Sequence, residues 1–584
     1  MVKYLLDREG KFIIENYNKA YPFSNFLPAI SGIWGIPLWA FYVNRGQCMI
    51  SFGVKDKNHS ILEFLPADRA YQASPILGFR TFIKLDDRFY YEPFKLNFGY
   101  SKQERMIITS YDLTLEEENH YLGLKFSVNY FTLPNMPFAS LVRILKIKNN
   151  SKKKLKLKIL DGLARIIPFG SREIFLKYLS HTLQAWMNSE IKKISNKEIA
   201  LFRLIVDPKD VSAIHYIEGT NFYYPFCDNK ETQPKVIVDP QKIFGEDTTF
   251  NIPVVFLDKK INLFKNQVLC GKTPCGFGFL KKVLNYNEEL IIYTLIGALF
   301  KMSGFKEKLK NINTDFVDRK KEENKEIIES IKNNAWCISS SHRFNEYIKS
   351  SYLDNILRGG YPFKFDNSRV YYLFSRKHGD LERDYNKFRL LPSYFSEGES
   401  NYRDINQNRR MDLFFNPYLY HKNVIYFMNL VRMDGYNPLL VRGEKLFFES
   451  EKVAKNILKK HSIPQEKDIL FLLKDGFYLG EFFNLLEERR IKVKNREKLA
   501  NLILEKAKSE PEAKFKDGFW IDHWHYNLDL IEGFLYFYPD KKEELFLNTD
   551  FMFWDDEFRV KERRYRYILK DKSCLLYTSD AADE

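Results

Sequence analysis

The sequence has few of the features that mark secreted, membrane-spanning or metal-binding proteins. Its six cysteines, at positions 48, 227, 270, 275, 337 and 574, are far apart and form no Cys-x-x-Cys pair, which argues for a reducing compartment and against a zinc site. No apolar run reaches the roughly 18 residues that a membrane-spanning helix needs. The N-terminal stretch MVKYLLDREGKFIIENYNK carries charges every few residues, so it is neither a signal peptide nor an anchor. These absences predict a cytoplasmic protein without a metal and without a membrane partner.

The sequence also lacks an arginine-rich block and an RNP-like motif, although its formal net charge is +15. The excess lysine is spread along the whole chain, so we interpret it as a compositional bias and expect no nucleic-acid partner. The hydrophobic content of 45% and the aromatic content of 16% predict a folded chain. A chain of 584 residues is too long for one ordinary core and suggests about two to four domains.

Patterns of period two predict β-structure in the first half of the chain. Leu155, Leu157 and Ile159 alternate with lysines, and a turn-forming Asn-Asn-Ser sequence precedes them at 149–151. Such alternation places one face of a strand in a core and the other in water. Similar short runs, bounded by Gly, Pro, Asn and Asp, recur up to about residue 300. We therefore expect residues 1–304 to form a large antiparallel β-sandwich domain.

The composition changes at about residue 305. Residues 305–334 are mostly charged, with a sparse apolar stripe, which is typical of a helical linker. Beyond it, apolar residues recur at helical spacing. Two helices illustrate this: one has Ala500, Ile503, Leu504 and Ala507 on one face and ends before Pro511, and the other has Leu528, Ile531 and Leu535 on one face and ends before Pro539. The sequence thus predicts a multidomain β + α protein whose second half, residues 335–573, is helical.

The last eleven residues, CLLYTSDAADE at 574–584, do not fit the rest of the chain. They look like the translation of a sequencing adapter. We therefore treat them as a non-native tail and leave them out of the functional argument.

Two polar segments of the helical half are candidate sites. The segment 375–417 contains Arg403, Asp404 and Gln407 among aromatic residues. The segment DGFWIDHWHYN, at 517–527, sets Asp522 among Trp520, Trp524, Tyr526 and two histidines. Planar polar side chains mixed with aromatic rings are what a sugar-binding subsite needs. A salt-bridged loop that packs two helices together has the same composition.

The two segments resemble paired motifs of the inverting glycoside phosphorylases of the cellobiose phosphorylase type, glycoside hydrolase family 94. NYRDINQNRR is similar to their Arg-Asp-x-x-Gln motif, and GFWID is similar to their Gly-Asp-Trp-Asn-Asp motif. The 118 positions from Asp404 to Asp522 are close to that family's interval. The segments PFSNFLPAISGIWGIPLWAFYVNRGQ and RKHGDLERDYN look closest to the β-1,3-oligoglucan phosphorylase branch, family 161. The sequence departs from the pattern at Phe519, Ile521 and Gly398, where the family has Asp, Asn and Arg.

The resemblance implies a fold and a set of roles. Residues 335–573 would be the N-terminal part of an (α/α)6 barrel. Asp522 would be the general acid that protonates the glycosidic oxygen. Trp520 would stack on or wall the sugar, and Arg403, Asp404 and Gln407 would bind its hydroxyl groups. The full-length protein would be a homodimer.

The implied reaction is inverting phosphorolysis of β-glucan oligosaccharides, β-1,3-linked by the nearest branch, with release of α-D-glucose 1-phosphate. Inorganic phosphate would be the cosubstrate, and no metal or organic cofactor is implied. An inverting hydrolase needs a second carboxylate to deprotonate water, whereas phosphate is already anionic and can attack unaided. Aromatic rings around Asp522 would exclude water and favour the protonated carboxyl group.

Other interpretations remain open. Asp522 could be a turn residue ahead of a helix that begins near Asn527. His523 and His525 form an H-x-H sequence, but no third ligand has suitable spacing, so structural or substrate-contacting histidines are favoured over a metal site. An inverting glycoside hydrolase on the same barrel, or a non-catalytic carbohydrate-binding protein, would also account for these residues.

The resemblance also implies that the chain is a truncated fragment. A complete barrel of this family takes about twelve helices, which is more than residues 335–573 hold at ordinary helix and loop lengths. The phosphate-binding residues of the family follow the general acid along the chain. We therefore expect this polypeptide to expose apolar helix faces and to show no phosphorolysis on its own.

Overall fold

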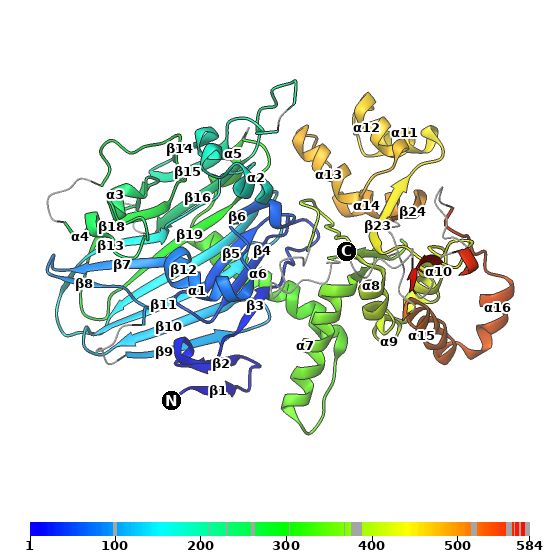
Figure 1. The fold of residues 1–584 in the computed structure, drawn as a ribbon, viewed down its shortest axis with the longest axis horizontal. Coiled ribbons are helices and arrows are strands. Elements are labelled where there is room, and N and C mark those ends of the chain that lie inside the picture. The colour runs from blue at the N-terminus through cyan, green and yellow to red at the C-terminus, as the bar shows by residue number, and fades with distance from the viewer. Residues whose placement is uncertain are drawn as a thin grey trace. The chain divides into compact units, whose positions relative to one another are not determined.

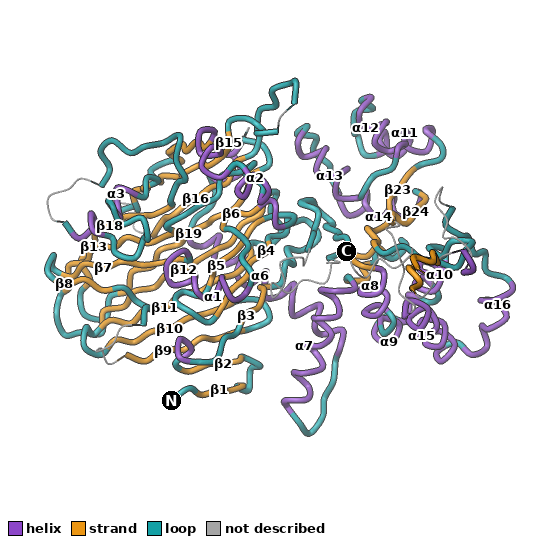
Figure 2. The backbone as a smooth tube through the Cα atoms, viewed as in Figure 1, coloured by secondary structure: helices purple, strands orange, loops and turns teal. Residues whose placement is uncertain are grey.

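The computed structural model describes most of the chain in two compact units. It describes all residues except 97–101, 210, 229–231, 259–262, 303, 367, 375–387, 515–521, 556–562, 566, 572–573 and 578–584. The first unit contains Met1–Ile331 and Ile338–Glu346, and the second contains Lys332–Cys337 and most of the chain from Tyr347 onward. Strands dominate the first unit and helices the second (Figure 2). The prediction of a β-rich first half and a helix-rich second half is confirmed.

The first unit is built on three antiparallel sheets (Figure 1). Among the described residues the largest sheet has ten strands, which lie in the spatial order β1 (Lys3–Leu6), β2 (Phe12–Glu15), β9 (Lys102–Ile108), β10 (Leu113–Asn119), β11 (Leu124–Thr132), β12 (Ala139–Asn149), β19 (Glu289–Leu299), β16 (Thr220–Cys227), β15 (Lys197–Leu204) and β14 (Met187–Ile194). A second sheet has the order β17 (Lys235–Ile237), β18 (Gly276–Leu284), β13 (Leu155–Leu163), β7 (Phe79–Leu85) and β8 (Phe89–Tyr91). A third consists of β3 (Ser24–Leu27), β4 (Trp39–Val43), β5 (Met49–Gly53) and β6 (Ser60–Leu62).

Buried polar contacts join the ten-stranded sheet to the five-stranded sheet. The Tyr223 hydroxyl on β16 donates to the backbone oxygen of Asp161 on β13, at 2.8 Å. Arg143 on β12 forms an ion pair of 2.5 Å with the Asp161 carboxylate, and the two side chains are 0% and 2% exposed. Arg143 also donates to Gln47, near the third sheet, at 2.5 Å. The interior between the sheets therefore holds a charged pair whose hydrogen bonds are made by the protein itself.

The predicted alternation at 155–159 is present, and it begins where the chain passes from the ten-stranded sheet to the five-stranded sheet. Leu155, Leu157 and Ile159 are buried while the lysines between them reach solvent. The strands before and after the turn at 149–151 do not pair with each other: β12 pairs with β11 and β19, and β13 pairs with β7 and β18. The buried Asn149 side chain donates to the backbone oxygens of Lys153 and Leu284. The turn therefore carries the chain from one sheet to the other.

Short helices accompany these sheets, and the charged segment after residue 305 is a longer one. They are α1 (Ala67–Leu77), α2 (Glu173–Tyr178), α3 (Gln241–Phe244), α4 (Val254–Leu257), α5 (Phe305–Leu309) and α6 (Thr314–Lys332). In α6, Val317 and Ile328 are fully buried, and the Asn324 side chain donates to the backbone oxygen of Tyr111 at 2.9 Å. The segment predicted to be a linker thus packs along the first unit through most of its length.

The second unit contains two groups of helices. One group consists of α7 (His342–Gly359, from Tyr347 onward), α8 (Tyr402–Arg409), α9 (Asp412–Phe415), α10 (Lys422–Met428), α15 (Asp522–Phe537) and α16 (Lys542–Leu547). The other consists of α11 (Glu451–Lys460), α12 (Lys467–Asp475), α13 (Leu479–Glu488) and α14 (Arg496–Lys506). The hairpins β20 (Tyr361–Phe363) with β21 (Tyr371–Leu373), and β25 (Tyr567–Asp571) with β26 (Cys574–Tyr577), complete the unit. Within the described ranges, no helix combines the length and apolar content that crossing a membrane requires.

A three-stranded sheet interrupts the region predicted to be helical throughout. It has the order β22 (Ser400–Asn401), β23 (Leu440–Phe447) and β24 (Lys508–Lys514). Leu440 pairs with Lys514, so the two ends of the 440–514 segment lie side by side. The segment includes α11 to α14. We call this segment the 440–514 lobe. The prediction missed β24 because its sequence KSEPEAK has no β-branched or aromatic residue and contains a proline, and β23 pairing is what holds it extended.

The pattern in 528–535 predicted the buried face of α15 only in part, since Ile531 and Leu535 pack against the core but Leu528 does not. Leu528 is 50% exposed, whereas Leu530 and Phe534 are buried together with His523 and Asn527. The helix also begins at Asp522, earlier than expected. The buried face carries polar side chains that form hydrogen bonds, so apolar periodicity alone could not identify it.

The buried ion pair of the first unit gives a stability prediction. We expect Arg143→Met to lower the free energy of unfolding by about 3 to 5 kcal/mol, because it leaves the Asp161 carboxylate buried without its cation. Adding Asp161→Asn to this variant removes the unpaired carboxylate charge and should restore part of the lost free energy of unfolding. Urea unfolding of the three proteins, followed by circular dichroism, measures both effects. If the single and double variants were equally stable, the unpaired charge of Asp161 would not be the cause of the lower free energy of unfolding.

Candidate active site

Arg403 and Asp522, one residue from each motif, meet at the amino ends of α8 and α15. Arg403 lies in the first turn of α8, and Asp522 is the first residue of α15. Arg403 Nη1 lies 3.8 Å from Asp522 Oδ2, and Arg403 Nε lies 3.7 Å from Asp404 Oδ1. Both distances are longer than a direct hydrogen bond. One guanidinium group is therefore shared between two carboxylates that are 118 positions apart in the sequence.

Buried hydrogen bonds hold the two helices in this arrangement. Asn527 on α15 accepts two hydrogen bonds through its Oδ1, from the Tyr402 hydroxyl at 2.8 Å and from the Asn406 side-chain amide at 2.7 Å. The Tyr402 ring also stacks on the imidazole of His523, with centroids 4.9 Å apart. All four side chains are buried. These contacts fix the first turns of α8 and α15 next to each other.

A pocket of about 410 Å³ opens beside Arg403. It is lined by Asp354, Arg358, Arg403, Asp404, Gln407, Asn408 and Tyr526. Arg403, Asp404 and Gln407 were predicted from the sequence to bind substrate, and their spacing on α8 brings them to one pocket. The sequence analysis did not identify Asp354 and Arg358, which form an ion pair of 3.0 Å on α7. Their spacing of four residues on a helix was the available signal, but it is shared by many surface ion pairs.

The lining of this pocket consists largely of planar hydrogen-bonding groups with one aromatic ring. Asp404 is mostly buried, while Gln407 is exposed. Asn401 donates a hydrogen bond to the Asp404 carboxylate at 3.3 Å, and the Asn408 amide donates to the backbone oxygen of Asp404 at 2.7 Å. Arginine and carboxylate side chains that are held in this way can form paired hydrogen bonds with neighbouring hydroxyl groups. The pocket thus fits a small polyhydroxylated ligand.

The Asp522 carboxylate is less enclosed than the sequence suggested. Its side chain is 37% exposed, and Trp524 points outward with 40% exposure. Trp520, predicted to wall the sugar, lies outside the described residues. One carboxylate oxygen, Asp522 Oδ1, is inaccessible to solvent and has no hydrogen-bond partner among the residues that the structure describes. Several other buried polar atoms in the described part of the chain are likewise without a hydrogen-bond partner, so this oxygen alone does not mark a functional group.

The two histidines of the H-x-H sequence have different environments. His523 is buried, and its Nδ1 lies 2.9 Å from Asn437 Oδ1, whereas His525 is exposed. Burial lowers the pKa of His523 to about 4. Because the two side chains leave α15 on different faces, they cannot hold one metal ion together. The described residues contain no group of three or more His, Cys, Asp or Glu that is arranged to hold a metal ion.

A buried acid, Asp412, lies near the site without lining the pocket. It begins α9, directly after α8, and its carboxylate accepts a hydrogen bond of 2.9 Å from the Tyr372 hydroxyl. Burial raises the pKa of Asp412 to about 7. Its titration near neutral pH would therefore change stability and should be separated from any pH dependence of activity.

Comparison with known proteins gives only distant likeness. No family model matches the sequence, and no curated protein matches it. A protein assigned as a kojibiose phosphorylase from the human microbiome shares 11% identity at a TM-score of 0.32, over 72% of this chain and 44% of that one. A bacterial glucoamylase complexed with acarbose shares 11% identity at 0.37, over 74% and 55%. A galactose mutarotase-like protein from Clostridium acetobutylicum shares 11% identity at 0.25, over 51% and 98%.

The chain thus spans about half the length of the first two solved structures. The TM-scores are too low to establish a common fold. The case for a function rests on the site.

The depressed pKa of His523 predicts that this residue's contribution to the stability of the second unit is lost in acid. The unfolded chain takes up this proton near the ordinary value of about 6.5, and the folded protein does so only near 4. The contribution of His523 to the free energy of unfolding is therefore complete above pH 6.5 and falls by roughly 3 kcal/mol as the pH drops to 4. Asp412, whose pKa is raised to about 7, contributes with the opposite sign over this range, equally in the wild type and in a His523 variant. The variant His523→Phe, which keeps a ring against Tyr402, should lack this component.

Thermal or urea unfolding at several pH values between 4 and 7.5 measures the difference. His525→Phe is the matched control, since His525 is exposed on the same helix. Parallel stability curves for the wild type and His523→Phe would contradict the assignment of a neutral buried histidine.

Proposed function

We propose that the chain carries the donor-sugar site of an inverting glycoside phosphorylase that acts on β-glucan oligosaccharides, β-1,3-linked by the sequence resemblance, and releases α-D-glucose 1-phosphate. In this proposal the helices of the second unit form part of an (α/α)6 barrel. Inorganic phosphate is the cosubstrate and no metal or organic cofactor takes part. The complete protein is proposed to act as a homodimer.

The observation that carries the proposal is the shared Arg403 guanidinium between Asp404 and Asp522. It brings Asp522 next to the α8 motif, beside a pocket that is lined by three of the four predicted substrate-binding residues. Asp522 Oδ1 accepts no hydrogen bond within the described part of the chain and can receive one from a ligand. This arrangement supports a site that is completed by a ligand.

The mechanism assigns one task to each side chain. Arg403, Asp404 and Gln407 hold the hydroxyl groups of the terminal sugar. The protonated Asp522 carboxyl gives its proton to the glycosidic oxygen as the bond from that oxygen to the anomeric carbon breaks. A phosphate oxygen attacks the anomeric carbon from the opposite face and forms the new bond, so the configuration inverts. Phosphate supplies its own negative charge, and the reaction then needs only one protein carboxyl group.

A second function has support from the same geometry. An inverting hydrolase needs two carboxylates on opposite sides of the scissile bond, and Asp404 and Asp522 both lie next to Arg403. In that case Asp404 would deprotonate water. A non-catalytic carbohydrate-binding protein would use the same pocket without needing a proton from Asp522. Product analysis separates these functions, because a hydrolase gives free glucose and a binding protein gives no product.

The first test concerns Asp522. In a complete enzyme that contains this sequence, Asp522→Asn should keep the fold and lower phosphorolysis by about 10² to 10⁴ fold, the usual contribution of a positioned proton donor. The measurement is glucose 1-phosphate release from laminaribiose and phosphate. Asp529→Asn is the matched control, because Asp529 lies on the same helix and pairs with Arg410, at 2.6 Å, rather than with Arg403. Turnover of Asp522→Asn at the wild-type rate would remove Asp522 from the mechanism.

The complete enzyme is specified because the resemblance implies phosphate-binding residues in later parts of the barrel. Residues 1–573 alone are expected to release no glucose 1-phosphate.

The second test distinguishes a sugar-holding Asp404 from a catalytic base. Under the phosphorylase proposal, Asp404→Ala should raise the KM for the oligosaccharide far more than the KM for phosphate, since it removes contacts to sugar hydroxyls only. Under the hydrolase alternative, the same variant should abolish glucose release, and the wild type should need no phosphate. Glucose as the only product of the wild-type enzyme would reject the phosphorylase proposal. If KM and kcat were unchanged in Asp404→Ala, the α8 residues would have a structural role and would not bind the sugar.

A further inference from the structure

A cleft of about 700 Å³ in the first unit collects basic side chains from three separate parts of the sequence. It lies at the turn between β7 and β8 and along the neighbouring ends of β13 and β18, which share the five-stranded sheet (Figure 1). Its basic residues are Arg88, Lys156, Lys158, Lys281 and Lys282, and its acidic residues are Asp86 and Asp87. The fold therefore brings five basic and two acidic side chains together at this cleft.

The sheet register places like charges side by side. Lys158 on β13 is directly opposite Lys281 on β18, an arrangement that costs stability in the absence of compensation. Lys158 is paired with Asp87 at 2.5 Å, and Lys282 is paired with Glu288 at 2.8 Å. Arg88, Lys156 and Lys281 are exposed and have no acidic partner among the described residues. Three positive charges at this cleft are thus left uncompensated.

The backbone fixes these charges in position. Asp86 and Asp87 both have positive φ, 48° and 58°, as the tight turn between β7 and β8 requires. The Arg88 amide donates to the backbone oxygen of Leu85, at 3.0 Å, and the backbone nitrogen of Asp86 donates to the oxygen of Lys156, at 2.9 Å. The hydrogen-bonded turn therefore carries Arg88 on a defined backbone next to the lysines of β13.

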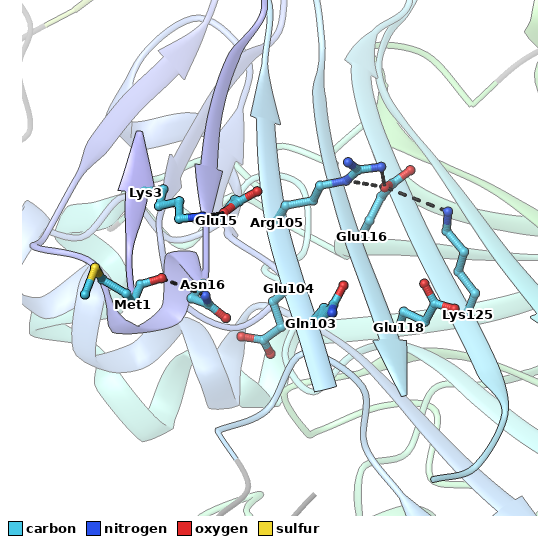
Figure 3. Close-up of a pocket in the computed structure, with 10 residues that line it drawn as sticks. All are labelled: Met1, Lys3, Glu15, Asn16, Gln103, Glu104, Arg105, Glu116, Glu118 and Lys125. Carbon is cyan, nitrogen blue, oxygen red and sulfur yellow. Dashed lines mark hydrogen bonds and ion pairs between the residues drawn. The ribbon is translucent and has the colours of Figure 1, made fainter. Parts of the chain in front are cut away.

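A second pocket of the same unit shows what a compensated surface looks like. It has a volume of about 530 Å³ and lies across β1, β2, β9, β10 and β11 (Figure 3). Its basic residues all have acidic partners: Lys3 pairs with Glu15, and both Arg105 and Lys125 pair with Glu116. Alternating charges on neighbouring strands are the usual way to solvate a sheet face. The basic cleft departs from this arrangement.

The chemistry of the cleft indicates the ligand class. Four of its five cations are lysines, which act as compact point charges and bind phosphate groups well. Its volume falls in the range of small-molecule sites. Phe89 and Val283 add apolar surface to the lining, which a purely ionic ligand would not need. We propose that this cleft is a binding site for a small molecule with two or more phosphate groups, such as a nucleoside diphosphate, and that it is distinct from the pocket at Arg403.

The proposal is independent of the proposed phosphorylase activity, because the cleft and the Arg403 pocket belong to different units of the chain. Its test is a binding measurement and needs no turnover.

Isothermal titration calorimetry of the whole chain with ADP and with inorganic tripolyphosphate tests the proposal. The double variant Lys156→Glu/Lys281→Glu should raise the Kd for both ligands by at least ~10-fold. The double variant Lys3→Glu/Lys125→Glu makes the same change in net charge in the compensated pocket and should change the Kd by less than ~2-fold. Arg88→Glu, at the exposed turn, gives an independent variant if the first double variant does not fold.

The outcomes decide the proposal. Tighter binding of ADP than of tripolyphosphate would show that the apolar part of the lining is used, and equal binding would show that the phosphates suffice; both results support the site. Failure of both ligands to bind the wild-type chain would overturn it. So would equal weakening in the two double variants, since only the overall charge of the protein would then matter.

Discussion

The arrangement of the candidate site depends on one buried acceptor, Asn527 Oδ1. It accepts hydrogen bonds from both Tyr402 and Asn406. A translation or rotation of α8 relative to α15 would therefore leave these buried donors without an acceptor. Such unpaired groups cost about 1 to 3 kcal/mol each. Arg403 follows Tyr402 directly, and Asp522 lies little more than one helical turn before Asn527. The positions of the charged groups are therefore set by neutral side chains beneath them, which need no contact with substrate.

This dependence explains which parts of the site the sequence could reveal. Arg403, Asp404 and Gln407 share one short helix, so a local motif was enough to group them, and the pocket contains all three. The sequence did not reveal the role of Asn527. Asparagine is common at helix ends, so the pattern predicts Asn527 as the start of the helix rather than as a core residue. Because His523 and Asn527 lie on the buried face of α15, the apolar pattern identified that face only in part: Ile531 and Leu535 pack against the core, and Leu528 is exposed. Asp354 and Arg358 come from α7 and could be added only by the tertiary structure.

The fold was predictable where one face of an element is apolar. The alternation at Leu155, Leu157 and Ile159 identified a strand whose core-facing side chains are buried, and the face of α14 with Ala500, Ile503 and Leu504 is buried as expected. Pairing partners were less predictable. The turn at 149–151 looks like a local hairpin, but β12 and β13 join different sheets, and β24 is extended only because β23 lies beside it. Long-range hydrogen bonds, which leave little trace in local composition, decided these cases.

The pairing of β23 with β24 has a consequence for the order in which the second unit folds. Contact between Arg403 and Asp522 requires the closure of a loop of more than one hundred residues, and closure entropy rises with loop length. Once Leu440 pairs with Lys514, the 440–514 lobe no longer counts toward that loop, and the remaining span is less than half as long. The lobe can assemble from helices that are close in sequence, which is the fast part of folding. Pairing of β23 with β24 therefore lowers the entropy cost of bringing the charged groups of α8 and α15 together.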